Sequence, residues 1–231
     1  MIHDPNERMM TTAPILLIWV EGIEDVRWWK MRLGQVKIPA KSLNYPIVDI
    51  RCWNTDLPER AQDIHVIDAQ RLPANRSDHL RQHFAQPNLH TFGASDVSRP
   101  HLQKWPSEAA LAAYLERLIA NFNGLALFGL SWSDYQLHQR QKGYRLGGRA
   151  LGSSWQSLLK TLWHHCKRPR QLTSVILFLR GNSTLGDYAV VCQQLEEHLS
   201  KHCLTTVSIL SDDETECSIV YQLTMEQYSD N

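Results

Sequence analysis

The sequence predicts an α/β fold with a mostly parallel, doubly wound sheet of Rossmann-like or P-loop-like topology. Helices are expected on both faces, with an antiparallel hairpin at the C-terminal end. Short apolar runs rich in β-branched residues alternate with longer segments of helical periodicity, a pattern typical of βαβ units. The last two apolar runs alternate polar and apolar residues around the acidic turn "SDDET", which indicates antiparallel strands at a sheet edge.

Composition bounds the class of protein. The chain has 231 residues, of which 43% are hydrophobic and 21% charged, as in soluble globular proteins. We expect a flexible leader at residues 1–12 and a single α/β domain at 13–231, with an irregular segment at 70–105. The apolar runs are too short to span a bilayer, so membrane insertion is not expected. Five scattered cysteines without a Cys-x-x-Cys motif favour a reducing compartment, and we expect a cytoplasmic protein.

The first half of the chain contains one clear helix between candidate strands. "PILLIWV" (14–20) reads as a buried strand. Val26, Trp29 and Leu33 then recur at helical spacing, and Gly34 ends the helix. Residues 46–53 and 63–69 are the next strand candidates, and a short helix is expected near 77–84.

The second half alternates more regularly. We expect a helix from Ser107 to Phe122, a buried strand in "GLALFGLSW", and a second helix that begins in a capping box of Ser153 and Gln156. "TSVILFLRG" is the clearest buried strand, and a helix over 184–199 follows it. The final hairpin joins 204–210 to 217–225.

An acidic pattern follows the first strand. Glu21 and Gly22 are followed by Asp25, and a later strand ends at Asp68. This opening resembles the first motif of the Toprim domain of primases, topoisomerases and related nucleases. The resemblance implies an Mg²⁺-dependent nuclease that uses Glu21, Asp25 and Asp68, because a hard divalent ion needs converging carboxylates. The later strand gives Asp-Ala-Gln and so lacks the second aspartate of that family's pair. The alternative is that these acids stabilise the positive end of a helix.

A glycine- and arginine-rich segment is the best anion-binding candidate. "KGYRLGGRALGSSW" stands before a capped helix, and a second turn follows the strand that ends at 180. Glycines admit a ligand, and arginines and helix N-termini bind phosphate. The candidate residues are Arg145, Gly147, Gly148, Arg149, Ser153, Arg180 and Gly181. The segment lacks the Walker A sequence, and its alternative interpretation is a solvated surface loop.

Tryptophan is the basis of the partner prediction. The chain has eight tryptophans, and tryptophan is a common anchor of protein interfaces. The helix geometry allows only one of Trp28 and Trp29 to be fully buried. We expect partner contacts at Trp28, Trp29, Trp53 and Trp132.

These observations favour a non-catalytic module for regulation or assembly. Such a module would use a degenerate nucleotide-binding-type fold and protein–protein contacts within a bacterial-type cytoplasmic complex. In its order of elements the second half resembles degenerate nucleoside-triphosphatase-like or receiver-like domains. No catalytic residue, cofactor or metal is expected; Mg²⁺ belongs only to the nuclease alternative. The third alternative is a sensor of nucleotides or other phosphate ligands that uses residues 142–154. The balance of 24 basic and 24 acidic residues argues against a whole-surface nucleic-acid binder and leaves a local patch open.

Overall fold

A single ten-stranded sheet organises the protein. The computed structural model describes residues 14–34, 46–57, 61–84, 86–93, 102–122, 126–181, 184–210 and 217–226. The expected leader at 1–12 lies outside them. The strands are β1 (Ile15–Val20), β2 (Ile47–Cys52), β3 (Ala61–Val66), β4 (Asn88–Phe92), β5 (Leu102–Trp105), β6 (Ala126–Phe128), β7 (Tyr144–Gly152), β8 (Leu172–Arg180), β9 (Leu204–Leu210) and β10 (Cys217–Met225). The helices are α1 (Ile23–Leu33), α2 (Ala74–His83), α3 (Glu108–Phe122), α4 (Trp132–Arg140), α5 (Trp155–His165) and α6 (Leu185–His198), with a 3₁₀ turn at Pro169–Gln171.

The sheet is mostly parallel, as predicted. Its strand order is β2-β1-β3-β4-β5-β7-β10-β8-β9-β6. The pairs from β2 through β7, and the β8–β9 pair, are parallel. The antiparallel character near the C-terminus is also present, but its pairing differs from a simple hairpin. β10 runs antiparallel between β7 and β8, so it is not adjacent to β9.

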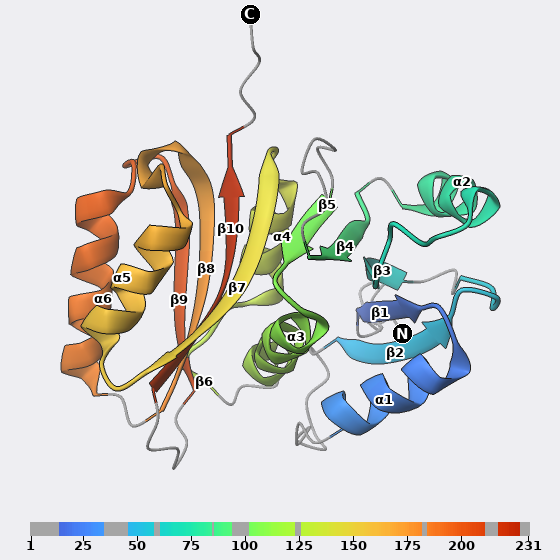
Figure 1. Cartoon of the computed structure of the whole chain (residues 1–231), viewed down its shortest axis with the longest axis horizontal. Helices are drawn as coiled ribbons and strands as arrows, with labels where there is room; N and C mark the ends of the chain where they lie inside the picture. The colour runs from blue at the N-terminus through green and yellow to red at the C-terminus, as the bar shows by residue number, and fades with distance from the viewer. Residues whose placement is uncertain are drawn as a thin grey trace, which may run out of the picture.

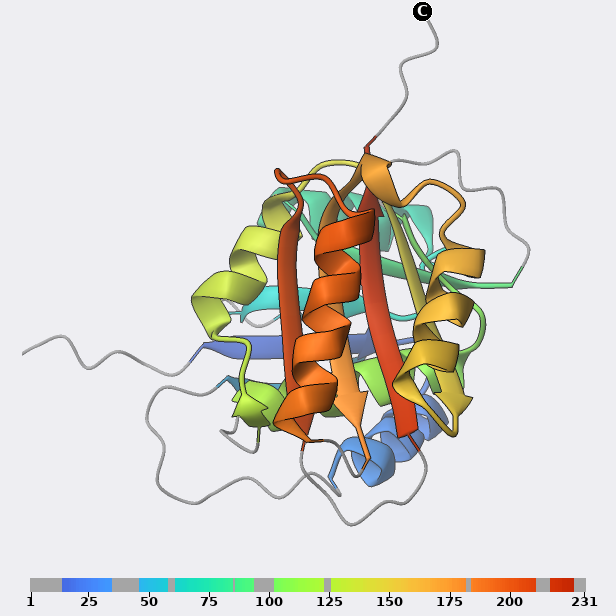
Figure 2. The ribbon, with the colours of Figure 1, turned by 90° about the vertical axis from the view of Figure 1, so that its left-hand side faces the viewer.

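Helices cover both faces of the sheet, which confirms the doubly wound class (Figure 1). On one face α1, α3 and α4 pack over the strands, and Trp29, Leu111 and Tyr135 are buried there. On the opposite face α2 covers the N-terminal strands through Leu80. The pair α5 and α6 covers β7, β10, β8 and β9 on that same face; Figure 2 shows both helices in front of these strands.

Three parts of the chain differ from the sequence prediction. The segment 70–105, expected to be irregular, contains α2, β4 and β5. The glycine-rich segment is strand β7, and α4 follows a strand β6 that is only three residues long. No helix in the described part of the chain is long and apolar enough to cross a membrane.

Candidate functional site

The carboxyl ends of β1 and β3 form the sheet edge at which α/β folds of this kind bind ligands. The chain leaves β1 through Glu21 and Gly22 and enters α1. β3 lies beside β1, with Trp19 opposite Val66. The chain after β3 turns at Asp68, whose φ is +52°. The two turns therefore lie at the same end of neighbouring strands.

Arg71 neutralises the first carboxylate at this edge. Its Nη1 lies 2.8 Å from Oε2 of Glu21, and its Nη2 donates to Oε1 at 3.0 Å. The same Nη1 lies 3.8 Å from Oδ2 of Asp68. A two-pronged contact of this kind fixes the carboxylate and the guanidinium in one relative orientation. Glu21 therefore already holds a cation supplied by the chain itself.

Two further carboxylates belong to the starts of helices. Asp25 accepts a hydrogen bond from the Gly22 N–H at 2.9 Å and so caps α1. Glu108, the first residue of α3, accepts one from Nε1 of Trp29 at 3.0 Å. Burial raises the pKa of Glu108, and the charges of Asp25 and Asp68 raise it further, against the lowering effect of the Trp29 bond. The edge is therefore acidic.

The structure gives no support to the magnesium site that the Toprim resemblance implies. Glu21 is paired with Arg71, and Asp25 is engaged as a helix cap. Within the described ranges, no group of three or more His, Cys, Asp and Glu residues is arranged to hold a metal ion. The interpretation of these acids as features of a turn and a helix start agrees with the geometry better.

The segment predicted as an anion-binding loop is a strand, and that prediction is corrected here. β7 pairs with β10 over its whole length. A Cβ added at Gly147 would lie 2.3 Å from the ring of Trp105, and one at Gly148 would lie 2.2 Å from the hydroxyl of Tyr221. These glycines therefore make room for aromatic side chains of the protein.

The first arginine of this segment is part of the interior. Arg145 lies near the start of β7, where its Nη1 donates to Oδ1 of Asn88 at 3.0 Å and to Oε1 of Gln139 at 2.8 Å. Burial lowers the pKa of Arg145, although nearby Tyr135, Tyr114 and Asp63 act in the opposite direction. The guanidinium donors of Arg145 are therefore used in hydrogen bonds within the protein.

The other two arginines lie toward the opposite end of the strands, on β7 and β8, which flank β10. Burial raises the pKa of Glu116. The charges of Arg32, Arg117, Arg180 and Arg149 lower it, so Arg149 and Arg180 both act on this carboxylate. Gly181 follows at a φ of +127°. Arg145 does not join Arg149 and Arg180 there, and the binding of an anion by these two arginines stays a prediction.

The cap of α5 is displaced by one residue from the prediction. The N-cap is Ser154, whose hydroxyl accepts a hydrogen bond from the Ser157 N–H at 3.3 Å. Ser153 precedes the helix and is exposed. Either serine can serve as an N-cap, but Gln156 stands three residues after Ser153 only, which is why the capping-box pattern indicated Ser153.

The four tryptophans predicted as partner anchors divide into two pairs. Trp29 is 0% and Trp53 is 5% exposed, so neither can anchor a partner, and these two predictions are corrected. Their indole N–H groups are used internally, by Glu108 and by the Trp19 carbonyl. Trp28 and Trp132 are only partly buried. As helix geometry required, one member of the Trp28–Trp29 pair is fully buried and the other is not.

Sequence reasoning missed a buried polar stripe beneath α4. Tyr135 donates to Oδ2 of Asp63 at 2.7 Å, and Asn88 donates to Oδ1 of the same carboxylate at 2.7 Å. Further along the sheet, His138 contacts the hydroxyls of Ser174 at 2.7 Å and Thr206 at 2.8 Å. The only signal in the sequence was the alternation of polar and apolar residues in the strands.

A chain of side-chain hydrogen bonds runs through this stripe in one direction. The indole of Trp105 can only donate, and it donates to Nδ1 of His90 at 2.9 Å. His90 must then carry its proton on Nε2, which lies 2.8 Å from Nδ1 of His65. His65 in turn meets Oδ2 of Asp63 at 3.1 Å. Burial raises the pKa of Asp63, but His65 and hydrogen bonds from Tyr135 and the Ile64 N–H outweigh it, so the pKa lies below its ordinary value.

The chain has a nucleotide-binding-type α/β fold, and the edge at the carboxyl ends of β1 and β3 is acidic. Among solved structures the chain is similar to FtsZ of M. jannaschii. It matches the W319Y mutant with a TM-score of 0.58 and 10% identity, over 93% of this chain and 91% of that one. It matches an empty FtsZ dimer with a TM-score of 0.58 and 8% identity, over 94% and 89%. The likeness identifies an FtsZ-like fold. No protein-family model matches the sequence, and no curated protein does.

Proposed function

We propose that this chain is a non-catalytic binding module for regulation or assembly, which acts through protein–protein contacts in a bacterial-type cytoplasmic complex. It would keep the architecture of an FtsZ-like fold, but the edge at the carboxyl ends of β1 and β3 would not bind a nucleotide. The solved FtsZ dimer supports the idea that this architecture is compatible with association between chains.

The acidic ligand edge is the observation that carries the proposal. A nucleotide would bring its phosphates to the turns that hold Glu21 and Asp68 and to the start of α1, where Asp25 is the cap. Two like charges 4 Å apart repel by about 4 kcal/mol at the effective dielectric constant typical near a protein surface. Phosphate sites use helix N-termini that attract anions. Here Asp25 and Glu24 already complement the positive end of α1.

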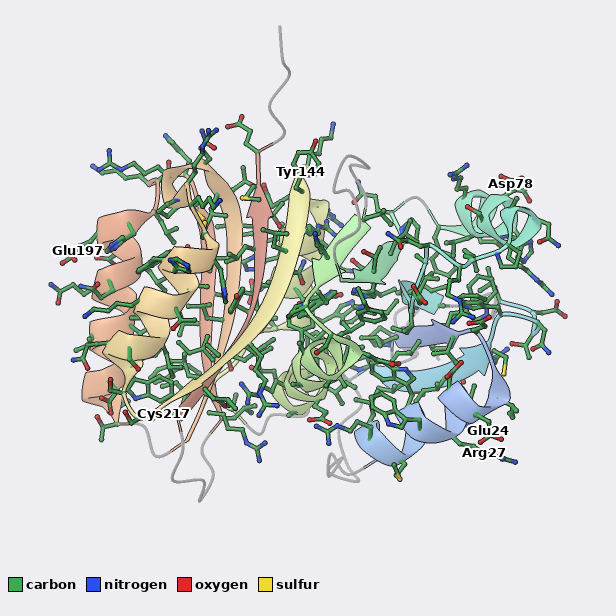
Figure 3. The ribbon with its side chains drawn as sticks, viewed as in Figure 1. Glu24, Arg27, Asp78, Tyr144, Glu197 and Cys217 are labelled. Carbon is green, nitrogen blue, oxygen red and sulfur yellow. The ribbon has the colours of Figure 1, made fainter. Side chains whose placement is uncertain are left out.

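The outer face of α1 is the candidate contact surface. A groove of about 490 Å³ is lined by Glu24, Asp25, Arg27, Trp28, Met31 and Glu108. Met31 is 63% exposed and Ile23 is 58% exposed. Glu24 and Arg27 form an ion pair of 2.6 Å on the same outer side of the helix, where Figure 3 labels them. A half-buried tryptophan with apolar neighbours and a charged rim is the usual anatomy of an interface.

Purification of the tagged full chain from its native host tests this proposal. We expect a complex of defined mass by light scattering, and we expect the double variant Trp28→Ala/Met31→Ser to lose it. The control is Lys30→Ala, which changes an exposed residue of the same helix outside the groove. Recovery of only a free monomer, or of an unchanged complex with the double variant, would contradict the proposed surface.

A phosphate sensor remains the second candidate because Arg149 and Arg180 act on the same carboxylate, Glu116. Glu116 itself is ion-paired with Arg32, and a phosphate near Arg149 and Arg180 would be attracted by the charges of both guanidinium groups. In isothermal titration with inorganic phosphate, binding lost in both Arg149→Ala and Arg180→Ala would favour this candidate over the binding module.

A further inference from the structure

The two edges of the sheet are protected to different degrees. At one edge, β2 carries Asp49 and Arg51, which form an ion pair of 2.7 Å. Charged residues on an edge strand discourage pairing with another chain. Near the other edge, β9 reads "LTTVSIL" over Leu204–Leu210, without a charge or a proline. β9 therefore lacks the side chains that usually block strand addition.

β9 also lacks an outer partner over most of its length. The last strand, β6, pairs with β9 only at Leu210 and Ile209. The chain then leaves the sheet to begin α4. In the described part of the chain, residues 204–208 are paired on one side only, with β8. The stretch is about 16 Å long, and alternate residues in it turn their backbone N–H and C=O groups outward, although Ser208 at its inner end is buried.

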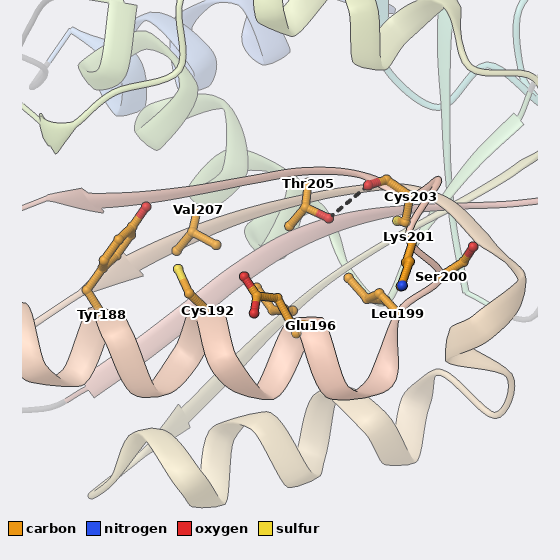
Figure 4. Close-up of a pocket in the computed structure, with 10 residues that line it drawn as sticks. Tyr188, Cys192, Glu196, Leu199, Ser200, Lys201, Cys203, Thr205 and Val207 are labelled. Atoms are coloured by element: carbon orange, nitrogen blue, oxygen red, sulfur yellow. Dashed lines mark hydrogen bonds between the residues drawn. The ribbon is translucent and has the colours of Figure 1, made fainter.

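A groove runs beside this open edge. It has a volume of about 540 Å³ and lies between α6 and β9. Its lining residues are Tyr188, Cys192, Leu195, Glu196, Leu199, Ser200, Lys201, Cys203, Thr205 and Val207. Figure 4 shows Tyr188 and Cys192 toward Val207 at one end, Lys201 near Cys203 at the other, and Glu196 between them. From Tyr188 to Leu199 the helix rises about 16 Å, the same length as the open strand.

We infer that an extended segment of a partner protein adds to the sheet as a strand along residues 204–208 of β9. This inference rests on the proposed function and names the kind of partner that it requires. Main-chain hydrogen bonds to β9 would supply affinity. Every second side chain of the segment would be apolar and enter the groove beside Leu195 and Val207.

The charges in the groove define the partner further. Glu196 and Lys201 are both exposed, and neither has an ion-pair partner within the described ranges. A basic residue near the middle of the segment would face Glu196. An acidic group at one end would face Lys201. These two contacts fix the register of a segment whose backbone alone could slip.

Steric exclusion argues against a second copy of this chain as the occupant. If two β9 edges paired antiparallel and centred on Thr206, Ile209 and Leu210 of each copy would lie opposite residues 203 and 202 of the other. β6 occupies the outer side of Ile209 and Leu210. Each β6 would then fall where the other copy's turn at 202–203 lies. A single extended segment brings no such strand with it.

Selection of a phage-displayed random peptide library on the full chain tests the inference. We expect enriched peptides to alternate apolar residues and to carry a basic residue. Their affinity should fall at least tenfold in Thr205→Lys, which places a charge at an exposed edge position. The matched control is Ala189→Lys, exposed on α6 and outside the groove. Glu196→Lys should weaken the same peptides, and hydrogen exchange should slow at residues 204–208 when a peptide is bound.

Three results would overturn the inference. The library could yield no enriched peptides, or the enriched peptides could lack alternating apolar residues. The peptides could also bind Thr205→Lys as tightly as the control Ala189→Lys. A dimer of the unliganded chain that dissociates in Thr205→Lys would also overturn it, in favour of self-pairing. If the host complex survives Thr205→Lys while the library gives no ligand, the inference fails and the proposed function stands. Circular dichroism verifies that each variant is folded.

Discussion

Gly147 is a residue at which the absence of a side chain sets the packing. A Cβ there would lie 2.3 Å from ring atoms of Trp105, which is fully buried and cannot retreat. We expect Gly147→Ala to lower the free energy of unfolding by about 3 kcal/mol, as overpacked cores do. Denaturant unfolding measures this. Gly186→Ala, where the nearest atom is the Thr184 hydroxyl at 3.5 Å, should leave stability unchanged or raise it by up to about 1 kcal/mol; equal losses in both variants would refute the explanation.

His138 makes stability depend on pH. Burial lowers its pKa from 6.5 to about 4, with a small opposing effect of Asp134. Because the folded pKa lies below the unfolded one, the stabilisation is complete above pH 6.5 and is lost as the pH falls toward 4. The loss amounts to about 3 kcal/mol. Burial also places the pKa of His90 well below its ordinary value, which adds a loss of the same sign.

Urea unfolding measured at several pH values tests this dependence. His138→Gln keeps a donor and an acceptor for Ser174 and Thr206 but does not titrate, so its stability should fall less steeply between pH 6.5 and 4. The control is His164→Gln, which changes an exposed histidine on α5. A slope unchanged by His138→Gln, or changed equally by the control, would show that this side chain does not cause the dependence.

At the scale of the elements, α4 packs against Phe122 of α3 through Trp132 and Tyr135 and also makes polar contacts with the sheet. Tyr135 bonds to Asp63, and His138 bonds to Ser174 and Thr206. We expect Tyr135→Phe to lower stability by about 1 to 2 kcal/mol, because it removes one donor from a buried carboxylate. Hydrogen exchange of the α4 amides should accelerate at the same time. Leu137→Ala, 46% exposed on the same helix, should have little effect; exchange equally fast in that variant would mean that apolar contacts hold α4.

The same elements show what the sequence could predict. α1, α3, α5 and α6 have apolar stripes of helical period, and β1 and β8 are continuous apolar runs, so local pattern alone identified them. β4, β5 and β7 are short, polar or rich in glycine. β4 and β5 depend on pairing with neighbouring strands. The glycines of β7 are explained by Trp105 and Tyr221, which lie far from β7 in the sequence. Pairing of that kind is decided by tertiary context and not by propensity.

For the whole molecule, one fold carries two electrostatic regions of opposite sign. Glu21, Asp25, Asp68 and Glu108 gather at the carboxyl ends of the N-terminal strands, whereas Arg149 and Arg180 lie at the carboxyl ends of β7 and β8. The sequence predicted Glu21, Asp25 and Asp68 at the first place and Arg149 and Arg180 at the second, but not Glu108. It could not predict that Arg71 would neutralise Glu21, because that contact joins turns 50 positions apart.

This arrangement predicts that nucleotides do not stabilise the protein. GTP or ATP with Mg²⁺ should leave the melting temperature unchanged, because their phosphates would meet Asp25, Asp68 and Glu108. A nucleotide that binds the folded chain would stabilise it by about 2.7 kcal/mol when the nucleotide concentration is one hundred times the dissociation constant. In a chain of this size that is a shift of about 5 to 10 °C. A shift of that size would contradict the argument that the acidic edge excludes nucleotides; if Arg149→Ala abolished it while Lys30→Ala did not, the ligand would lie at Arg149.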